Sequence, residues 1–490
     1  MVFSSHIFIY FFLPLTLLGY YLLRGAPQRW RNLWLAGTGY VFYGWAEPRF
    51  VGLMFATTSL DWMLSLVIAH DEWRPWRWRG EPPGLERGGA RSGRQRRALL
   101  GSVMSNLLAL GVFKYFNFGL ESLNAMLAGC GLDQMQWEPA WRIVLPLGIS
   151  FYTFQALSYI IDVYRGDARA MANFVDFSCF ASMLPHLVAG PILKFSFLAE
   201  QLRSRTLTVD KFARGAAFFL MGLSKKVLLA NPCGKIADTA FDAGARGVVE
   251  AWMGAVGYAF QIYFDFSGYS DMAVGLGLMF GFVFAKNFDA PYRAESLTDF
   301  WRRWHISLST WLREYLYIPL GGNRRGTVRT YFNLVVTMVL GGLWHGASWN
   351  FLIWGGLHGG VLAWERMQGG GGVLRKAPRV VRMGLTFGVV LVGWVFFRAA
   401  DLPRAWRYLG DLLGLHAVPE SASLLGGALM RPSLLGALGV AALVVWGGRQ
   451  TWEWTQRLTL AKAAVCLGVG ALALVVLATQ EYNPFIYFIF

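Results

Sequence analysis

The chain contains few charged residues and few cysteines. Charged side chains make up only 15% of its 490 residues, whereas a soluble globular domain has about 25%. The four cysteines are widely scattered, with no CxxC pair and no Cys/His spacing of a zinc site. The sequence therefore predicts neither a disulfide framework nor a metal site, and we interpret the cysteines as small apolar core residues.

Acidic residues are the scarcer charged class, 29 against 45 basic residues, which gives a formal net charge of +16. Nucleic-acid-binding proteins have such a balance, but here the arginines gather in short gaps between apolar runs. This distribution is typical of cytoplasmic loops under the positive-inside rule, so we expect no nucleic-acid partner. The gap 71–97 carries eight arginines against four acids. We predict that it is a cytoplasmic insert that contacts anionic lipid headgroups.

Long apolar runs recur from one end of the chain to the other, and 55% of the residues are hydrophobic. We predict an all-α, polytopic transmembrane protein with roughly eleven to thirteen membrane segments, forming a single domain over 1–490. The first run has no basic residue ahead of it and no cleavage site after it, so we expect an uncleaved span. Candidate spans are 7–24, 32–46, 49–69, 98–116, 142–163, 174–191, 212–232, 252–283, 331–348, 350–366, 382–398, 433–447 and 461–478.

Some of these runs contain polar residues or prolines. The run 252–283 is too long for one straight span and carries two aspartates, so we predict a break around Phe264–Gly268. Prolines bracket His186, which predicts a bent or re-entrant backbone. The His186 side chain then either forms a structural hydrogen bond or lines a tunnel. Gln155 and Asp162 share one helix face, and we favour packing between helices over a polar seam.

The segment 285–330 interleaves arginine with tryptophan and is predicted to be amphipathic and to lie at the cytoplasmic interface. It is either an ordinary anchoring segment or an anion site, because guanidinium groups pair with phosphates and an aromatic face can stack on a base. A phosphorylated acyl carrier would suit such a site, and Gly321–Asn323 adds a turn that brings the backbone close to a ligand. The residues concerned are Arg293, Arg302, Arg303, Arg313, Arg324, Arg325 and Arg329, with Trp301, Trp304 and Trp311.

His345 lies in the segment 331–366, which otherwise has the composition of transmembrane helix. Ionisable groups inside a membrane are costly and usually face a cavity or a partner. An imidazole has an unperturbed pKa of about 6.5 and can act as a general base. The alternative is a core histidine with a satisfied hydrogen bond. His358 would lie about 20 Å further along a continuous helix unless the helix breaks at Gly355–Gly356, so we interpret it as structural.

Several catalytic patterns are absent from the sequence. It contains no HExxH, no GxxxxGK(S/T), no GxSxG and no pair of carboxylates at a useful spacing. No serine or cysteine in the apolar runs is visibly coupled to a base. The sequence therefore favours direct transfer with a histidine base over a covalent enzyme intermediate.

Five ordered stretches carry a family resemblance: Leu145–Asp167, Pro185–Pro191, Tyr263–Asp271, Phe300–Gly326 and Gly341–Gly346. Together with both ends of the chain, up to Pro484–Phe488, they resemble the membrane-bound O-acyltransferase family and, within it, the bacterial alginate O-acetyltransferases. The resemblance implies a helical shell around a central tunnel, with re-entrant or interfacial helices. It makes His345 the membrane-embedded catalytic histidine and His305 the second polar position of the family. The insert 71–97 departs from the pattern.

The resemblance also implies a reaction. We expect an O-acetyltransferase of the bacterial inner membrane that moves an acetyl group from cytoplasmic acetyl-CoA to an exported polysaccharide, alginate or a similar exopolysaccharide. His345 would deprotonate the acceptor hydroxyl, and His305 or Asn350 would steady the oxyanion. We expect a separate periplasmic acetyltransferase as a partner, and no bound cofactor or metal. The donor phosphates would bind near Arg302, Arg303, Trp304, Trp311, Asn323 and Arg324.

Two alternatives remain open at this point. The acceptor could instead be peptidoglycan, cellulose or teichoic acid. The chain could also be a transporter or flippase whose histidines only relay protons. Such transporters often contain repeated halves, and the sequence shows no internal repeat.

Overall fold

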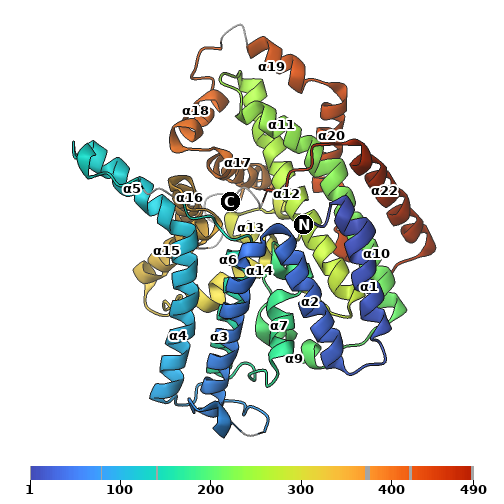
Figure 1. Ribbon diagram of the computed structural model, residues 1–490. Helices are drawn as coiled ribbons and strands as arrows, with labels where there is room; N and C mark the ends of the chain where they lie inside the picture. The colour runs from blue at the N-terminus through green and yellow to red at the C-terminus, as the bar shows by residue number, and fades with distance from the viewer. Residues whose placement is uncertain (1, 79, 139–141, 370–375, 419–421, 487–490) are drawn as a thin grey trace. The chain divides into compact units, whose positions relative to one another are not determined.

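A computed structural model describes residues 2–78, 80–138, 142–369, 376–418 and 422–486. Within these ranges every regular element is a helix, which confirms the prediction of an all-α protein (Figure 1). The chain divides into two compact units. Unit 1 is Met1–Phe212 with Gly277–Phe284, and unit 2 is Ala213–Leu276 with Ala285–Phe490. The single domain over 1–490 stays a prediction.

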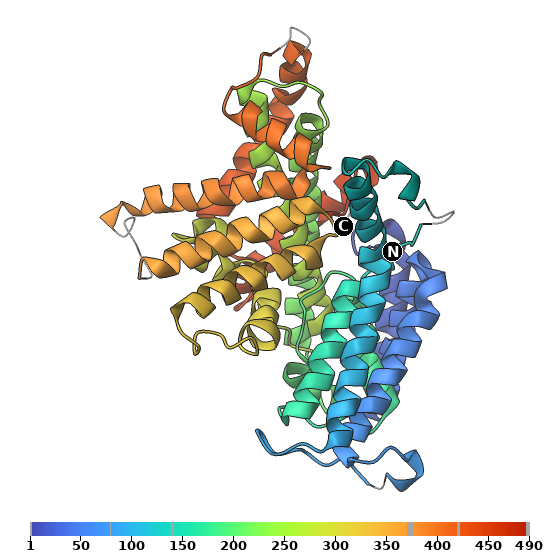
Figure 2. The same cartoon turned by 90° about the vertical axis from the view of Figure 1, so that its left-hand side faces the viewer.

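Unit 1 consists of helices packed through apolar faces. In chain order they are α1 (Leu13–Leu22), α2 (Gln28–Ala46), α3 (Val51–His70), α4 (Gly93–Leu110), α5 (Phe116–Gly129), α6 (Ile149–Arg165), α7 (Phe174–Ser182), α8 (Leu184–Leu187) and α9 (Phe195–Arg203). Helices α3, α4 and α6 pack against one another, as Figures 1 and 2 show. A capping box starts α4, because the side chains of Ser92 and Gln95 each accept the other's backbone N–H.

Buried polar residues of unit 1 join its helices by hydrogen bonds. Gln155 Nε2 donates to the His186 carbonyl oxygen at 3.4 Å, and the Asp162 carboxylate accepts the Ser196 N–H at 3.0 Å. The His186 ring Nε2 lies 2.7 Å from the carbonyl oxygen of Phe180. These contacts confirm the packing interpretation of Gln155 and Asp162 and the structural hydrogen bond of His186.

The arginine-rich insert 71–97 folds back onto the C-terminal end of α6. Arg91 Nε donates to the Tyr164 carbonyl oxygen at 2.7 Å, and Arg87 forms an ion pair with Asp167 at 2.8 Å. Arg79 lies outside the described residues. Contact of the insert with anionic headgroups stays a prediction.

Unit 2 contains the polar stretch that the sequence singles out. Its helices are α10 (Val209–Ser224, in this unit from Ala213 on), α11 (Asn231–Phe241), α12 (Val248–Met279, to Leu276), α13 (Leu297–Arg303), α14 (Ile306–Leu312), α15 (Thr327–His345), α16 (Trp349–Met367), α17 (Arg379–Arg398), α18 (Leu402–Leu412), α19 (Ala422–Leu429), α20 (Pro432–Gly447), α21 (Thr451–Trp454) and α22 (Leu460–Thr479). Its apolar core is rich in aromatic side chains of α12, α13, α16 and α17.

Helix α12 is continuous over 32 residues, so the predicted break around Phe264–Gly268 is wrong. The two aspartates that suggested a break have cationic partners after α10: Lys226 pairs with Asp265 at 2.7 Å, and Lys225 pairs with Asp271 at 2.6 Å. Gly268 lets the two helices approach closely, since a Cβ there would lie 2.7 Å from the Gly222 carbonyl oxygen. Paired charges and close packing therefore keep the helix intact.

Several helices of the described residues are suited to a membrane. Four are long and apolar enough to cross it, namely Pro48–His70, Gly93–Gly129, Arg379–Arg398 and Leu460–Thr479, and two shorter apolar helices are Phe8–Leu22 and Pro432–Gly447. Other predicted spans fall on helices that are shorter or more polar, such as α6, α7 and α10. The count of eleven to thirteen segments and the central tunnel stay predictions.

Helices α15 and α16 form a tight antiparallel hairpin that turns at residues 346–348. Glycines allow this contact: a Cβ at Gly342 would lie 2.2 Å from the Phe351 carbonyl oxygen, and one at Gly355 would lie 2.4 Å from that of Met338. Helix α17 packs on the other side of α16, and Figure 2 shows the three helices as neighbours in gold to orange. The hairpin places His345 at its turn.

Candidate active site

His345 is the last residue of α15 and is 7% exposed. The helix ends there because the backbone of Gly346 is extended, with φ of −157°. Residue 346 must also be small, since a Cβ at Gly346 would lie 1.9 Å from the Phe351 ring. Aromatic rings surround the imidazole, with centroids at 4.9 Å for Trp344, 5.3 Å for Trp354 and 5.3 Å for Phe397. Such a site holds an imidazole in one orientation and limits its contact with water.

His305 lies in the short connection between α13 and α14 and is fully buried. Its ring centroid is 6.4 Å from that of His345 and 4.6 Å from that of Phe266. Its backbone is left-handed, with φ of 44°, a conformation that costs about 1–3 kcal/mol for a residue other than glycine and clusters at functional sites. The structure thus brings together the two histidines that the sequence predicts to be catalytic.

The Asn287 side chain and Ser307 hold the His305 ring. His305 Nδ1 lies 3.3 Å from Asn287 Oδ1, which also accepts the Ser307 backbone N–H at 3.2 Å and the Ser307 hydroxyl at 2.8 Å. His305 Nε2 has no hydrogen-bond partner among the described residues. Burial lowers the pKa of His305 well below its ordinary value, so the ring is neutral at physiological pH. No sequence pattern indicated Asn287, because it lies 18 residues before His305, and irregular chain and a short helix separate the two.

His358 is fully buried and lies closer to this site than its sequence position suggests. The estimate of about 20 Å assumed a continuous helix, but the chain turns back at 346–348, so the estimate was wrong. The Trp354 ring contacts both His358 and His345, with centroid-to-centroid distances of 4.7 Å and 5.3 Å. His358 Nδ1 accepts the Trp301 indole N–H at 3.2 Å, which agrees with a structural interpretation.

Three of the predicted substrate-binding residues pack inside unit 2. Asn350 Nδ2 donates to the Ala399 carbonyl oxygen at 2.7 Å and so ties the start of α16 to the end of α17. Trp304 is buried with its ring centroid 5.0 Å from that of Trp394. Trp311 is also buried, 5.1 Å from the Tyr315 ring. In this structure these three side chains pack and hydrogen-bond within the protein, and their contact with substrate stays a prediction.

Arg302 and Asn323 line a cleft of about 1040 Å³ among α13, α15, α16 and α17. Glu365, Arg366 and Arg382 also line it, so its walls carry both signs of charge. The cleft touches the first residues of α15, whereas His345 is the last. The two ends of this helix are about 27 Å apart at 1.5 Å per residue.

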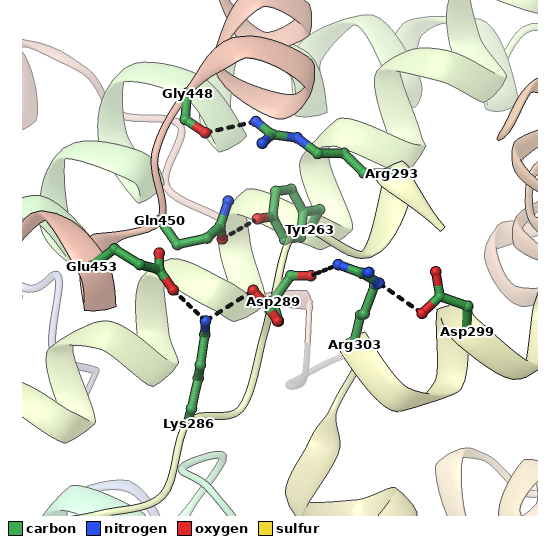
Figure 3. A network of polar contacts seen from close by, with 9 residues as sticks. All are labelled: Tyr263, Lys286, Asp289, Arg293, Asp299, Arg303, Gly448, Gln450 and Glu453. Atoms are coloured by element: carbon green, nitrogen blue, oxygen red, sulfur yellow. Dashed lines mark hydrogen bonds and ion pairs between the residues drawn. The ribbon is translucent and has the colours of Figure 1, made fainter. Parts of the chain in front are cut away.

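Arg303 and Arg324 do not line this cleft. Arg324 is exposed. Arg303 pairs with Asp299 at 2.9 Å and also reaches the Asp289 carbonyl oxygen, as Figure 3 shows. In the same network Lys286 pairs with Asp289 at 2.8 Å and with Glu453 at 2.5 Å. These ion pairs hold Lys286 and Asp289, on either side of Asn287, and so help to keep the Asn287 side chain against the His305 ring.

These helices define a class of protein, a helical multi-pass membrane protein with a buried pair of histidines. Residues 167–371 match the model of the MBOAT, membrane-bound O-acyltransferase family. The probable alginate O-acetylase of Azotobacter vinelandii is 49% identical over 83% of this chain and 77% of its own length. The chain therefore belongs to the membrane-bound O-acyltransferase family and is an acyltransferase, as the resemblance predicted.

Two further relatives define the range of this similarity. The probable alginate O-acetylase of Pseudomonas putida is 42% identical over the whole of both chains. The peptidoglycan O-acetyltransferase of Helicobacter pylori is 33% identical over 85% of this chain and 81% of its own length. Both names describe O-acyl transfer, which agrees with an enzyme rather than a transporter.

Proposed function

We propose that this chain transfers acetyl groups from cytoplasmic acetyl-CoA for the O-acetylation of an exported polysaccharide, alginate or a similar exopolysaccharide. The observation that carries the proposal is the His305–His345 pair, whose ring centroids are 6.4 Å apart. Both rings are buried among aromatic side chains, and His345 lies at the turn of the α15–α16 hairpin. The names of the relatives from Azotobacter vinelandii and Pseudomonas putida support alginate as the acceptor.

In the proposed reaction His345 acts as a general base. Its ring takes the proton of the acceptor hydroxyl while the hydroxyl oxygen attacks the thioester carbonyl carbon. The tetrahedral intermediate then collapses, the C–S bond breaks, and the proton passes from His345 to the leaving CoA thiolate. A positioned general base contributes about 10²–10⁴-fold to such a step. The aromatic rings around His345 exclude water that would otherwise hydrolyse the thioester.

The cleft lined by Arg302 and Asn323 is the proposed site for the polar part of the donor. Its volume of about 1040 Å³ exceeds the roughly 300–1,000 Å³ of most small-molecule sites. Arg302 and Arg382 supply guanidinium groups for phosphates. The thioester at the far end of an extended donor would then approach the histidines. We propose that the chain lies in the bacterial inner membrane and passes the acetyl group to a separate periplasmic acetyltransferase.

The test uses purified protein in lipid bilayers with labelled acetyl-CoA. Wild-type protein should release CoA and label an acceptor, whereas a transporter would do neither. His345→Ala should lower the rate by about 10²–10⁴-fold, and His70→Ala, a partly exposed histidine of unit 1, serves as the matched control. A wild-type rate in His345→Ala would remove this histidine from the mechanism.

Peptidoglycan is the second candidate acceptor, because the relative from Helicobacter pylori is named a peptidoglycan O-acetyltransferase. Parallel assays with alginate and with peptidoglycan fragments, each run with and without a candidate periplasmic acetyltransferase, compare the two acceptors. Labelling of alginate alone supports the first proposal, and labelling of peptidoglycan alone overturns it.

A further inference from the structure

The orientation of the Asn287 amide is fixed by a backbone group. The Ser307 backbone N–H can only donate, so the Asn287 atom 3.2 Å from it must be the oxygen, Oδ1. A second backbone bond, from the Ile306 N–H to the Asn287 carbonyl oxygen at 2.9 Å, holds the two segments in register. The amide therefore cannot be flipped without leaving a buried N–H unsatisfied.

This orientation determines the tautomer of His305. The same Oδ1 lies 3.3 Å from His305 Nδ1, and an amide oxygen only accepts, so the proton of the neutral ring must be on Nδ1. The Ser307 hydroxyl donates to Asn287 Oδ1 at 2.8 Å, and its oxygen lies 3.4 Å from the same ring nitrogen, where it can accept a share of that N–H. Nε2 then carries no proton, so its lone pair can accept a hydrogen bond. It is also the ring nitrogen that has no partner among the described residues.

The other side of the amide faces a small polar cavity. Asn287 lines a space of about 20 Å³ together with Ser267, Asp271 and Gln450. A single water needs about 10–15 Å³ and two to four polar partners. Asn287 Nδ2 and Ser267 Oγ are both buried and have no partner among the described side chains, so both can donate into this space. The cavity thus has room for a water that would accept from the amide in the orientation that the backbone imposes.

We propose that Asn287 is a positioning residue of the transfer reaction, whose amide oxygen holds His305 as the Nδ1–H tautomer and leaves Nε2 as a hydrogen-bond acceptor. The inference rests on the proposed role of the histidine pair. It revises the expectation that His305 steadies the oxyanion, because a neutral ring in this tautomer has no N–H at Nε2 to donate. His305 instead accepts a hydrogen bond from a donor group at the reaction site.

The first test reads the tautomer in the wild-type protein. Solid-state NMR of bilayer-embedded protein with ¹⁵N-labelled histidine gives separate signals for protonated and unprotonated ring nitrogens, and the signals of His305→Gln subtracted from those of wild type assign His305. A protonated Nδ1 with an unprotonated Nε2 is the expected result. The opposite tautomer overturns the proposal, whatever the activity of any variant.

The second test distinguishes the hydrogen-bond acceptor of the Asn287 side chain from its size and shape. Asn287→Asp keeps an acceptor oxygen toward His305 and Ser307, at the edge of a cavity that Lys225 and Lys286 also line. Asn287→Leu has a similar size but no acceptor. In Asn287→Leu kcat should fall by about 10- to 100-fold, by analogy with the loss of a hydrogen-bond partner that orients a metal-bound imidazole, with the KM for acetyl-CoA within about twofold. Asn287→Asp should restore most of kcat.

A matched control is Asn231→Leu, another buried amide of unit 2, which contacts the Tyr482 carbonyl oxygen and no histidine. Its kcat should stay near wild type. An unchanged kcat in Asn287→Leu, or an Nδ1–H signal that persists in it, overturns the proposal. Activity retained in His345→Ala would instead refute the proposed function while leaving the tautomer measurement intact.

Discussion

Replacing Lys226 by methionine should destabilise the protein more than any other single change at the α10–α12 contact. The Lys226–Asp265 pair is 2.7 Å long, and its side chains are 3% and 2% exposed. Removing one partner of a buried pair leaves an uncompensated charge and costs about 3–5 kcal/mol. The pair also holds the end of the chain, because Lys226 donates to the Pro484 carbonyl oxygen and Asp265 accepts the Ile486 N–H at 2.9 Å.

The neighbouring pair provides the matched comparison. Lys225 and Asp271 are 13% and 18% exposed, and Thr451 donates to the same carboxylate at 2.7 Å. Water and Thr451 compensate Asp271 when its partner is removed, so Lys225→Met should cost much less than Lys226→Met. The double variant Lys226→Met with Asp265→Leu should regain most of the lost stability, because an apolar replacement of a buried pair is often neutral.

The assay is the free energy of unfolding in mixed micelles, followed by tryptophan fluorescence during a denaturant titration. Equal losses for Lys226→Met and Lys225→Met would refute the reasoning, since burial would then not set the cost. A double variant as unstable as Lys226→Met would refute it as well. Proteolysis at the C-terminus measures release of the terminal segment independently.

Three further predictions follow from single contacts. Arg302→Ala should raise the KM for acetyl-CoA several-fold with little change in kcat. Arg313→Ala should not, because Arg313 is exposed and pairs with Glu314 in the described part of the chain; steady-state kinetics measure both. Gly346→Ala should cost about 1–3 kcal/mol and most of the activity, because its Cβ would clash with an aromatic ring; unfolding and rate assays measure both. Glu365→Gln should cost about 1.5–3 kcal/mol in the same unfolding assay, since its carboxylate accepts three hydrogen bonds from α13.

The sequence predicted features that depend on local pattern and missed those that depend on distant partners. Apolar runs long enough to cross a membrane indicated helices throughout, the apolar surroundings of His345 singled out that residue, and the family resemblance added His305. The continuity of α12 could not be seen, because it depends on Lys225 and Lys226, about 40 residues earlier in the chain. Asn287 could not be seen either, because only the folded chain brings it to His305.

The arginine-rich segment shows the same limit for a binding site. From composition alone all of its arginines were equal candidates for an anion site, yet in the structure they lie in different environments. Arg302 lines the cleft, Arg303 is paired with Asp299, and Arg324 is exposed. Charge along a chain predicts that an anion site is possible, but the direction of each side chain decides which guanidinium groups reach it.

The way α13 lies along α16 has a mechanical consequence. Near the cleft, the Glu365 carboxylate of α16 accepts hydrogen bonds from the first turn of α13. Midway along the two helices, the Trp301 indole donates to His358. At the far end, α13 ends beside His305, and α16 begins at the turn that follows His345. Helix α13 therefore leads directly to His305, and α16 is joined through the turn at 346–348 to His345, the last residue of α15. In the proposed function, a donor that shifts the cleft end of α13 would also shift His305 relative to His345, which would couple donor binding to the alignment of the two imidazoles.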